Sequence, residues 1–238
     1  MMKIGILLVG RASEDLVDEY GTYAEMLIAL INTEEQVFEF KTFNILDDEF
    51  PKDHLECDGW IVTGSPHGVY EDHSWIPTVS QLINNVYEAN LPIFGVCFGH
   101  QLIAQALGGH VEKSEKGWGL GLHTYQVNNK PDYMSNLSEE VTLNICHQDQ
   151  VLRPPQGATV YAKSEFCENA GFYIKDKVLT MQAHPEFLVD FTKALLTARR
   201  DVTIPKEFVD PALVGLKNNP DSVQSNEFAK TVRQFFLA

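Results

Sequence analysis

A cysteine between two glycines is the feature of this sequence that points most directly to chemistry. Residues 91–101 read LPIFGVCFGHQ, in which an apolar run leads through Gly95, Cys97 and Gly99 into a helical pattern. A tight turn of this form projects its central residue from the edge of a sheet. The positive end of the following helix favours the thiolate, the nucleophilic form of cysteine. We therefore predict that Cys97 is a nucleophile rather than an ordinary buried thiol.

A thiolate nucleophile needs a base, and the base needs a group that orients it. Residues 179–186, LTMQAHPE, supply both at the end of another strand-like run. Alternation along an extended chain places His184 and Glu186 on one side, and Pro185 restrains His184 to an extended conformation. We predict His184 as the base and Glu186 as its partner, with an ordinary surface turn as the alternative.

Attack on a carbonyl also requires N–H donors for the oxyanion. The backbone N–H of Phe98 is one candidate, because this residue follows the nucleophile at the start of the helix. Gly64 and Ser65 follow a third strand-like run, in TGSPHG, where small residues let backbone amides approach a substrate. A plain β-turn would use the same residues, so both interpretations stay open here.

Other reactive side chains have simpler explanations. Cys146 is expected to be a packed core thiol, and Trp118 to lie either in a loop over the substrate or in a buried hairpin corner. Three histidines lie among acidic residues, but their spacing matches no metal site, so we expect no bound metal and no cofactor: His54, His67 and His73.

An α/β architecture is required to bring the reactive residues together. In the N-terminal half, apolar runs alternate with helical patterns, which predicts right-handed βαβ units and an open, mostly parallel sheet with helices on both faces. We expect strands at 3–9, 36–43, 59–63 and 92–96, and helices at 20–31, 76–89 and 99–107.

The second half contains closely spaced strand candidates, which indicate antiparallel hairpins that return to the sheet. These candidates lie at 123–127, 141–146, 159–162, 171–174 and 178–182, with a helix expected at 188–199 and an amphipathic helix near 226–236. We expect one domain over residues 1–200, with 201–238 as a helical extension of it. The role of this tail is open: it could cap the sheet, close over the site or contact another subunit.

Composition narrows the classes of partner. The 238 residues are 44% hydrophobic and 21% charged, which is typical of a globular enzyme. A net charge of −15 argues against binding to nucleic acid or to an anionic membrane. No run approaches 18 apolar residues and no secretory signal is visible, so we expect a cytoplasmic protein without a disulfide framework. The oligomeric state is not indicated.

Three motifs in this order and separation resemble the class I (triad-type) glutamine amidotransferase family: TGSP at 63–66, GVCFGHQ at 95–101 and HPE at 184–186. Two further segments are most similar to stand-alone members such as plant γ-glutamyl peptidases and to the glutaminase half of GMP synthase. These segments are GSPHGVYEDHSWI at 64–76 and CHQDQV at 146–151. The resemblance implies a three-layer, flavodoxin-like fold.

The resemblance also implies roles for individual residues. Cys97 would be the nucleophile, His184 the base and Glu186 its partner. The oxyanion hole and the contacts to the γ-glutamyl group would come from Gly64, Ser65, Phe98, Gln101, His147, Gln148 and Asp149. Many relatives have glycine where Ser65 and Gln148 stand, and a left-handed backbone at either position would be strained in this chain.

The implied reaction is hydrolysis of a γ-glutamyl amide bond in a small molecule, either glutamine or a γ-glutamyl peptide, through a γ-glutamyl thioester. No synthetase domain is visible in the chain, which favours a peptidase-like hydrolase. The alternatives are a glutaminase that delivers ammonia to a separate synthetase partner, and a catalytically inactive binding protein of the same fold.

Overall fold

A nine-stranded sheet forms the centre of the computed structural model, which describes residues 1–32 and 36–238. Five neighbouring strands are parallel, in the order β2 (Phe38–Asn44), β1 (Met2–Leu8), β3 (Gly59–Val62), β4 (Ile93–Val96) and β11 (Val178–Met181). The sheet continues antiparallel through β10 (Gly171–Ile174), β9 (Thr159–Lys163), β6 (Gly119–Val127) and β7 (Glu140–His147). A parallel half joined to antiparallel hairpins was expected from the sequence, and this is confirmed.

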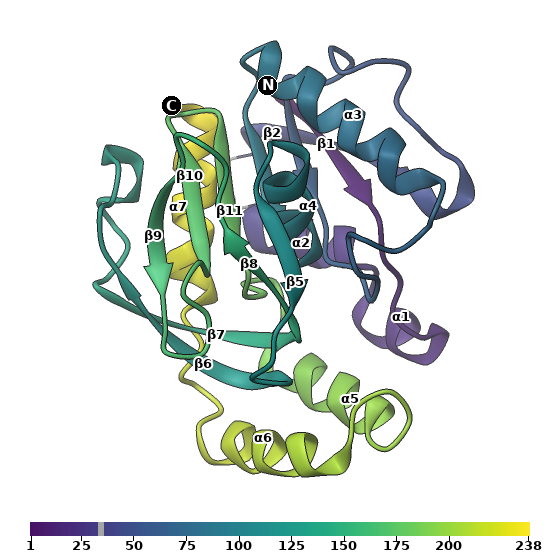
Figure 1. The fold of residues 1–238 in the computed structure, drawn as a ribbon, viewed down its shortest axis with the longest axis vertical. Coiled ribbons are helices and arrows are strands. Elements are labelled where there is room, and N and C mark those ends of the chain that lie inside the picture. The colour runs from purple at the N-terminus through teal and green to yellow at the C-terminus, as the bar shows by residue number, and fades with distance from the viewer. Residues whose placement is uncertain (33–35) are drawn as a thin grey trace.

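Helices cover both faces of the sheet. One face carries α2 (Tyr23–Ile31) and α7 (Ser225–Leu237), and the other carries α3 (Trp75–Glu88) and α4 (Phe98–Ala106). The remaining elements are α1 (Glu14–Tyr20), α5 (Val189–Arg199), α6 (Lys206–Asn218), the short 3₁₀ turns Ile45–Asp47 and Asp132–Met134, and the small sheet of β5 (His110–Lys113) and β8 (Asp149–Arg153). Figure 1 shows α5 and α6 together at one end of the molecule, next to β6 and β7.

Alternation along the strands produces the three layers. Ile4 and Ile6 of β1 belong to the buried cluster under α2 and α7, whereas Leu7 and Val9 belong to the cluster under α3 and α4. Successive side chains of a strand point to opposite faces, so a strand buried on both faces is a continuous apolar run. The central strands therefore hold two cores apart, and their carboxyl ends define one edge.

The expected helix 20–31 is wrong at its start. Two helices occupy this region, because Gly21 has a φ of 81° and ends α1. Thr22 then begins α2 with a capping box, in which its N–H donates to Glu25 Oε2 over 2.7 Å and its Oγ1 accepts from the Glu25 N–H over 3.2 Å. The apolar spacing alone did not reveal this break.

Helix α6 and the β5–β8 sheet were not expected. Helix α6 begins after Pro205 and contains Pro211, whereas the only helix expected within the 201–238 extension was the one near 226–236. Proline is well tolerated before or within the first turn of a helix but costs a backbone hydrogen bond further in. Packing of α6 against β6 stabilises it despite this loss.

The C-terminal helix packs into the core. Phe228, Val232 and Phe236 of α7 are buried in the same cluster as Phe94 of β4, and the rings of Phe228 and Phe94 lie 6.3 Å apart. Figure 1 shows α7 along β9, β10 and β11. Of the roles left open for the tail, α7 therefore covers a face of the sheet.

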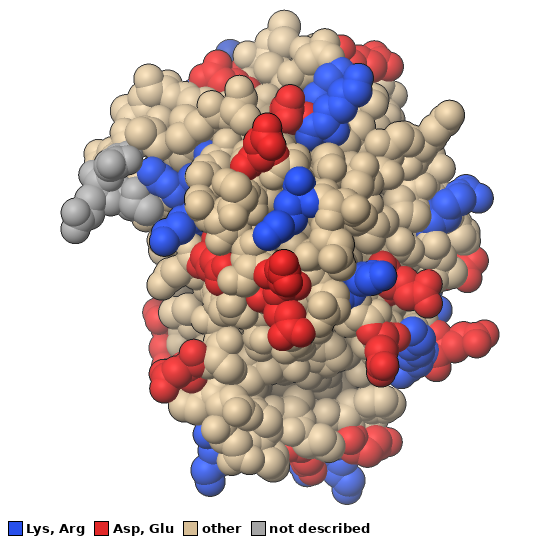
Figure 2. Space-filling model, turned by 90° about the vertical axis from the view of Figure 1, so that its left-hand side faces the viewer, with Lys and Arg blue, Asp and Glu red and all other residues tan. Residues whose placement is uncertain are grey.

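Charged side chains of both signs are mixed on the surface. On the face shown in Figure 2, Lys and Arg side chains are scattered among Asp and Glu, and many surface atoms belong to other residues. Within the described ranges, no helix combines the length and apolar character needed to cross a bilayer.

Replacement of Phe228 by alanine tests the contribution of α7. Loss of this fully buried ring is expected to lower the free energy of unfolding by about 3–5 kcal/mol. The matched control is Leu237→Ala on the same helix, which is 57% exposed and should change stability by less than about 0.5 kcal/mol. Urea unfolding measures both. Equal effects of the two substitutions would show that α7 is not part of the core.

Candidate active site

Cys97 occupies a tight turn between β4 and α4. Its backbone has φ 51° and ψ −104°, an unfavourable conformation for a residue with a side chain, and its N–H donates to Met181 O over 2.9 Å. A Cβ at Gly99 would lie 2.2 Å from Val62 O, and one at Gly95 would lie 2.6 Å from Gly99 O. The two glycines thus allow the close packing that holds the strained cysteine at the N-terminus of α4.

His184 and Glu186 follow β11, the strand beside β4. Glu186 Oε1 lies 2.7 Å from His184 Nδ1, and both side chains are buried. The backbone N–H of His184 donates to Asn144 O over 2.8 Å. The imidazole ring stacks on Phe187, with ring centroids 3.8 Å apart and an interplanar angle of 3°. Backbone, carboxylate and aromatic contacts therefore all fix the orientation of the imidazole.

The electrostatic environment favours a charged imidazole. Burial alone would lower the pKa of His184, but the neighbouring Cys97 sulfur and the Glu186 carboxylate outweigh this effect and raise it to about 10. Both groups hydrogen-bond to the imidazole and favour its charged form. The site therefore holds a protonated imidazole between the Cys97 sulfur and the Glu186 carboxyl group.

Gly64 lies between the two reactive side chains. A Cβ at this position would be 2.8 Å from His184 Cε1 and 3.8 Å from Cys97 Cβ. Any larger residue would displace the imidazole. The turn after β3 therefore contributes space, which lets the imidazole approach the Cys97 side chain.

Two glutamines connect the nucleophile to the opposite wall. Gln182 Nε2 lies 3.6 Å from Cys97 Sγ, and Gln182 Oε1 accepts from Gln101 Nε2 over 3.1 Å. Gln101 Nε2 also donates to Asp149 O over 2.8 Å. Gln101 thus ties α4 to the start of β8.

A cavity of about 170 Å³ opens in front of the nucleophile. Six of the ten residues proposed from the sequence line it: Ser65, Cys97, Gln101, His147, Gln148 and Asp149. His184 and Glu186 lie beyond it in the wall, and Phe98 is buried against Trp75 with ring centroids 5.6 Å apart. Neither Ser65 nor Gln148 has a positive φ, so the strain considered for these two departures from the family is absent.

His147 is a neutral part of the cavity wall. Its Nδ1 donates to Asp149 O over 3.0 Å, and burial lowers its pKa to about 3. Burial raises the pKa of the nearby Asp149 carboxyl. Burial thus disfavours the charged forms of both His147 and Asp149 in this wall.

Sequence reasoning missed several residues of the site. Gln182 directly follows β11 and contacts the Cys97 sulfur, and alternation with His184 could have indicated it. Arg199, fifteen residues after His184, reaches the cavity only because α5 folds back to it, and no local pattern reveals this. Trp118 and Cys146 also line the cavity, so each of them faces the site.

One group of side chains could coordinate a metal ion. The donor atoms of His67, Glu71 and His73 lie within 4.8 Å of one another, and His67 and Glu71 also line the cavity, although no metal site was expected from the sequence. Glu71 Oε2 already accepts from His67 Nδ1 over 3.1 Å and from His73 Nε2 over 2.9 Å. His54 is not part of this group; its carbonyl accepts from Trp60 Nε1.

Replacement of Gly64 by alanine tests the contact between base and nucleophile. The added methyl group should push the imidazole away and slow alkylation of Cys97 by iodoacetamide at neutral pH by at least about tenfold, because less thiolate is present. Gly215→Ala, in open space on α6, should leave the rate unchanged. Alkylation is followed by mass spectrometry of the peptide that contains Cys97. An unchanged rate in Gly64→Ala would contradict the proposed geometry.

Known proteins resemble this chain over most of its length. Residues 15–199 match the family model described as glutamine amidotransferase class-I. The chain is 35% identical to γ-glutamyl peptidase 4 of Arabidopsis thaliana over 76% of its own length and 74% of that protein, and 31% identical to a GMP synthase [glutamine-hydrolyzing] of Bacillus velezensis over 71% of its own length and 29% of that protein.

The fold also matches solved structures. A glutamine amidotransferase from Thermotoga maritima superimposes with a TM-score of 0.80 at 18% identity and covers 100% of this chain and 99% of that one. The resemblance read from the three motifs is thereby confirmed. The chain belongs to the class I glutamine amidotransferase family.

Proposed function

We propose that this protein hydrolyses γ-glutamyl amide bonds through a thioester on Cys97. The observation that carries the proposal is the buried alignment of Glu186, His184 and Cys97, with 2.7 Å between the carboxylate and the imidazole. Such an arrangement generates a thiolate and holds a proton ready for a leaving amine. The small polar cavity accommodates an amino-acid side chain rather than a polymer.

In the first step, the Cys97 sulfur attacks the γ-carbonyl carbon of the substrate. The backbone N–H groups of Phe98 and Ser65 are proposed to stabilise the oxyanion, because the first belongs to the helix N-terminus and the second lines the cavity. His184 gives its proton to the amide nitrogen, and the C–N bond breaks. The products are a γ-glutamyl thioester and a free amine.

In the second step, His184 takes a proton from water, which attacks the thioester carbon. The C–S bond breaks, glutamate leaves and the thiolate returns. Glu186 stabilises the imidazolium in both steps and does not touch the substrate, because it lies behind the imidazole. Gln101, His147, Gln148 and Asp149 are proposed to contact the γ-glutamyl end of the substrate.

Two leaving groups fit this chemistry. A γ-glutamyl peptidase releases an amino acid or a peptide. The Arabidopsis relative, which aligns with 76% of this chain, is named a γ-glutamyl peptidase. A glutaminase releases ammonia for a synthetase, as the name of the GMP synthase relative suggests, but this chain spans only 29% of that protein. The similarity to the peptidase covers more of the relative's length, so we favour the peptidase function. A glutaminase that delivers ammonia to a separate synthetase partner is the second candidate.

We also propose that the protein acts in the cytoplasm. Its four cysteines are free and buried, which suits a reducing compartment. Limited proteolysis and fractionation of cells that express the full chain test this location directly. Recovery in a secreted fraction would contradict it.

Alanine substitution of the three central residues tests the proposed chemistry. Cys97→Ala should abolish turnover of glutamine and of γ-glutamyl dipeptides. His184→Ala should come close to this loss. Glu186→Ala should be less severe, because orientation contributes less than proton transfer. Turnover is measured by release of glutamate. Continued turnover by Cys97→Ala would exclude the mechanism, and a wild-type protein that neither turns over nor acylates would be a binding protein of this fold.

The pH dependence of Glu186→Gln tests the role of the carboxylate. The carboxylate helps to raise the pKa of His184 to about 10, so its removal should lower that pKa. The protonated imidazole is then lost at lower pH, and the alkaline decline of kcat/KM should begin at lower pH than in the wild type. Exposed Glu207→Gln is the matched control and should keep the wild-type profile. An unshifted alkaline limb in Glu186→Gln would contradict the assignment.

A further inference from the structure

Arg199 is a cation in the cavity wall without a carboxylate partner. It is the last residue of α5, its side chain is partly buried, and its Nη1 donates to Cys146 Sγ over 3.6 Å. Among the described residues, no Asp or Glu lies within 4.0 Å of its guanidinium. The adjacent Arg200 differs: its Nε and Nη2 donate to the two oxygens of Asp210 over 2.6 and 2.9 Å.

The position of Arg199 relative to the reacting atoms is the second observation. It lines the cavity in front of Cys97, and it also lines a narrow cleft whose other walls include His184 and Phe187. Gln101 and Asp149, the contacts proposed for the γ-glutamyl end, line only the first cavity. Arg199 therefore lies on the imidazole side of the nucleophile, and Gln101 and Asp149 lie on the opposite side.

This side of the nucleophile is where the leaving group must lie. The amide nitrogen receives its proton from His184, so atoms attached to that nitrogen extend toward the imidazole side of the cavity. Ammonia, the leaving group from glutamine, has no non-hydrogen atoms beyond its nitrogen. An amino acid or a short peptide carries a carboxylate, and a partly desolvated guanidinium binds a carboxylate through two parallel hydrogen bonds.

We propose that Arg199 forms a subsite for the carboxylate of a leaving amino acid or short peptide, which makes the enzyme selective for γ-glutamyl peptides over glutamine. The inference rests on the proposed γ-glutamyl hydrolysis and specifies its leaving group. Cys146 Sγ is a weak acceptor, so a carboxylate replaces this contact at little cost. The chain is acidic overall, with 33 Asp and Glu against 18 Lys and Arg, which makes an unpaired arginine here more notable.

Matched substrates test the subsite within a single protein preparation. Wild type and Arg199→Gln are compared on γ-glutamyl-alanine, on γ-glutamyl-alanyl-glycine, on the C-terminal amide of each, and on glutamine. We expect Arg199→Gln to lower kcat/KM for at least one of the two free acids about ten- to hundredfold. The corresponding amide and glutamine should change little. Arg199→Lys, which keeps the charge but not the planar fork, should retain part of the preference.

Lys113→Gln is the matched control. This lysine also lines the cavity but, unlike Arg199, does not line the cleft beside His184. Its replacement should leave the ratio of acid to amide unchanged. Misfolding of a variant would lower kcat/KM for all substrates together. Unchanged values of kcat/KM for the amides and for glutamine therefore exclude misfolding as the cause.

Several results would overturn the inference. Equal losses on acid, amide and glutamine in a folded Arg199→Gln protein would place the arginine at the γ-glutamyl end of the substrate or in a structural role. A wild-type protein with the same kcat/KM for each free acid and its amide would also overturn the inference, because no carboxylate would then be recognised. A wild-type protein that hydrolyses none of these substrates would instead refute the proposed function, and the subsite with it.

Discussion

The buried contact of one imidazole with a cysteine sulfur and a carboxyl group is the interaction on which this site depends. A carboxylate behind His184 and a sulfur in front of it together outweigh the cost of burying a positive charge, and the pKa of the imidazole rises to about 10. Both groups contribute to this rise, since a buried ion without partners would become neutral. The pairing requires three side chains from two chain segments, 97 and 184–186, to meet with little freedom.

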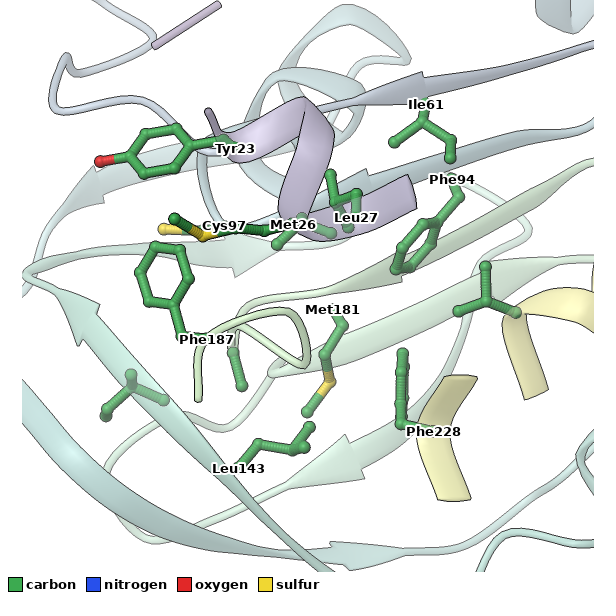
Figure 3. Close-up of a cluster of buried hydrophobic side chains, with 14 of the residues drawn as sticks. Tyr23, Met26, Leu27, Ile61, Phe94, Cys97, Leu143, Met181, Phe187 and Phe228 are labelled. Carbon is green, nitrogen blue, oxygen red and sulfur yellow. The ribbon is translucent and has the colours of Figure 1, made fainter. Parts of the chain in front are cut away.

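The parallel strands provide this rigidity. β4 and β11 are neighbours, so the turn after one and the extended segment after the other end at the same edge. The turn after β3 adds Gly64, whose missing side chain leaves room for the imidazole, and Phe187 stacks on the ring. Figure 3 shows Cys97 at the same end of the large apolar cluster as Tyr23 and Phe187. The core thereby fixes the geometry of the site that stands at its edge.

Much of this could be predicted from the sequence, for physical reasons. Strand-like runs, flanking glycines and a proline after the base are local signals, and they placed β4, β11 and the residues Cys97 and His184. The capping box at Thr22 was also local but was overlooked because apolar spacing runs across it. Arg199 and helix α6 could not be predicted in this way, since tertiary packing alone brings α5 to the cavity and stabilises a helix that contains Pro211.

The protonation state of His184 tests the central claim most directly. Nitrogen-15 NMR of ring-labelled histidine at pH 8, with His184→Gln used for assignment, reports whether one or both ring nitrogens carry a proton. The ion pair predicts a doubly protonated His184 at this pH in the wild type and a neutral ring once Cys97 is replaced by alanine. A neutral imidazole in the wild-type protein, with Cys97 intact and unmodified, would contradict the account.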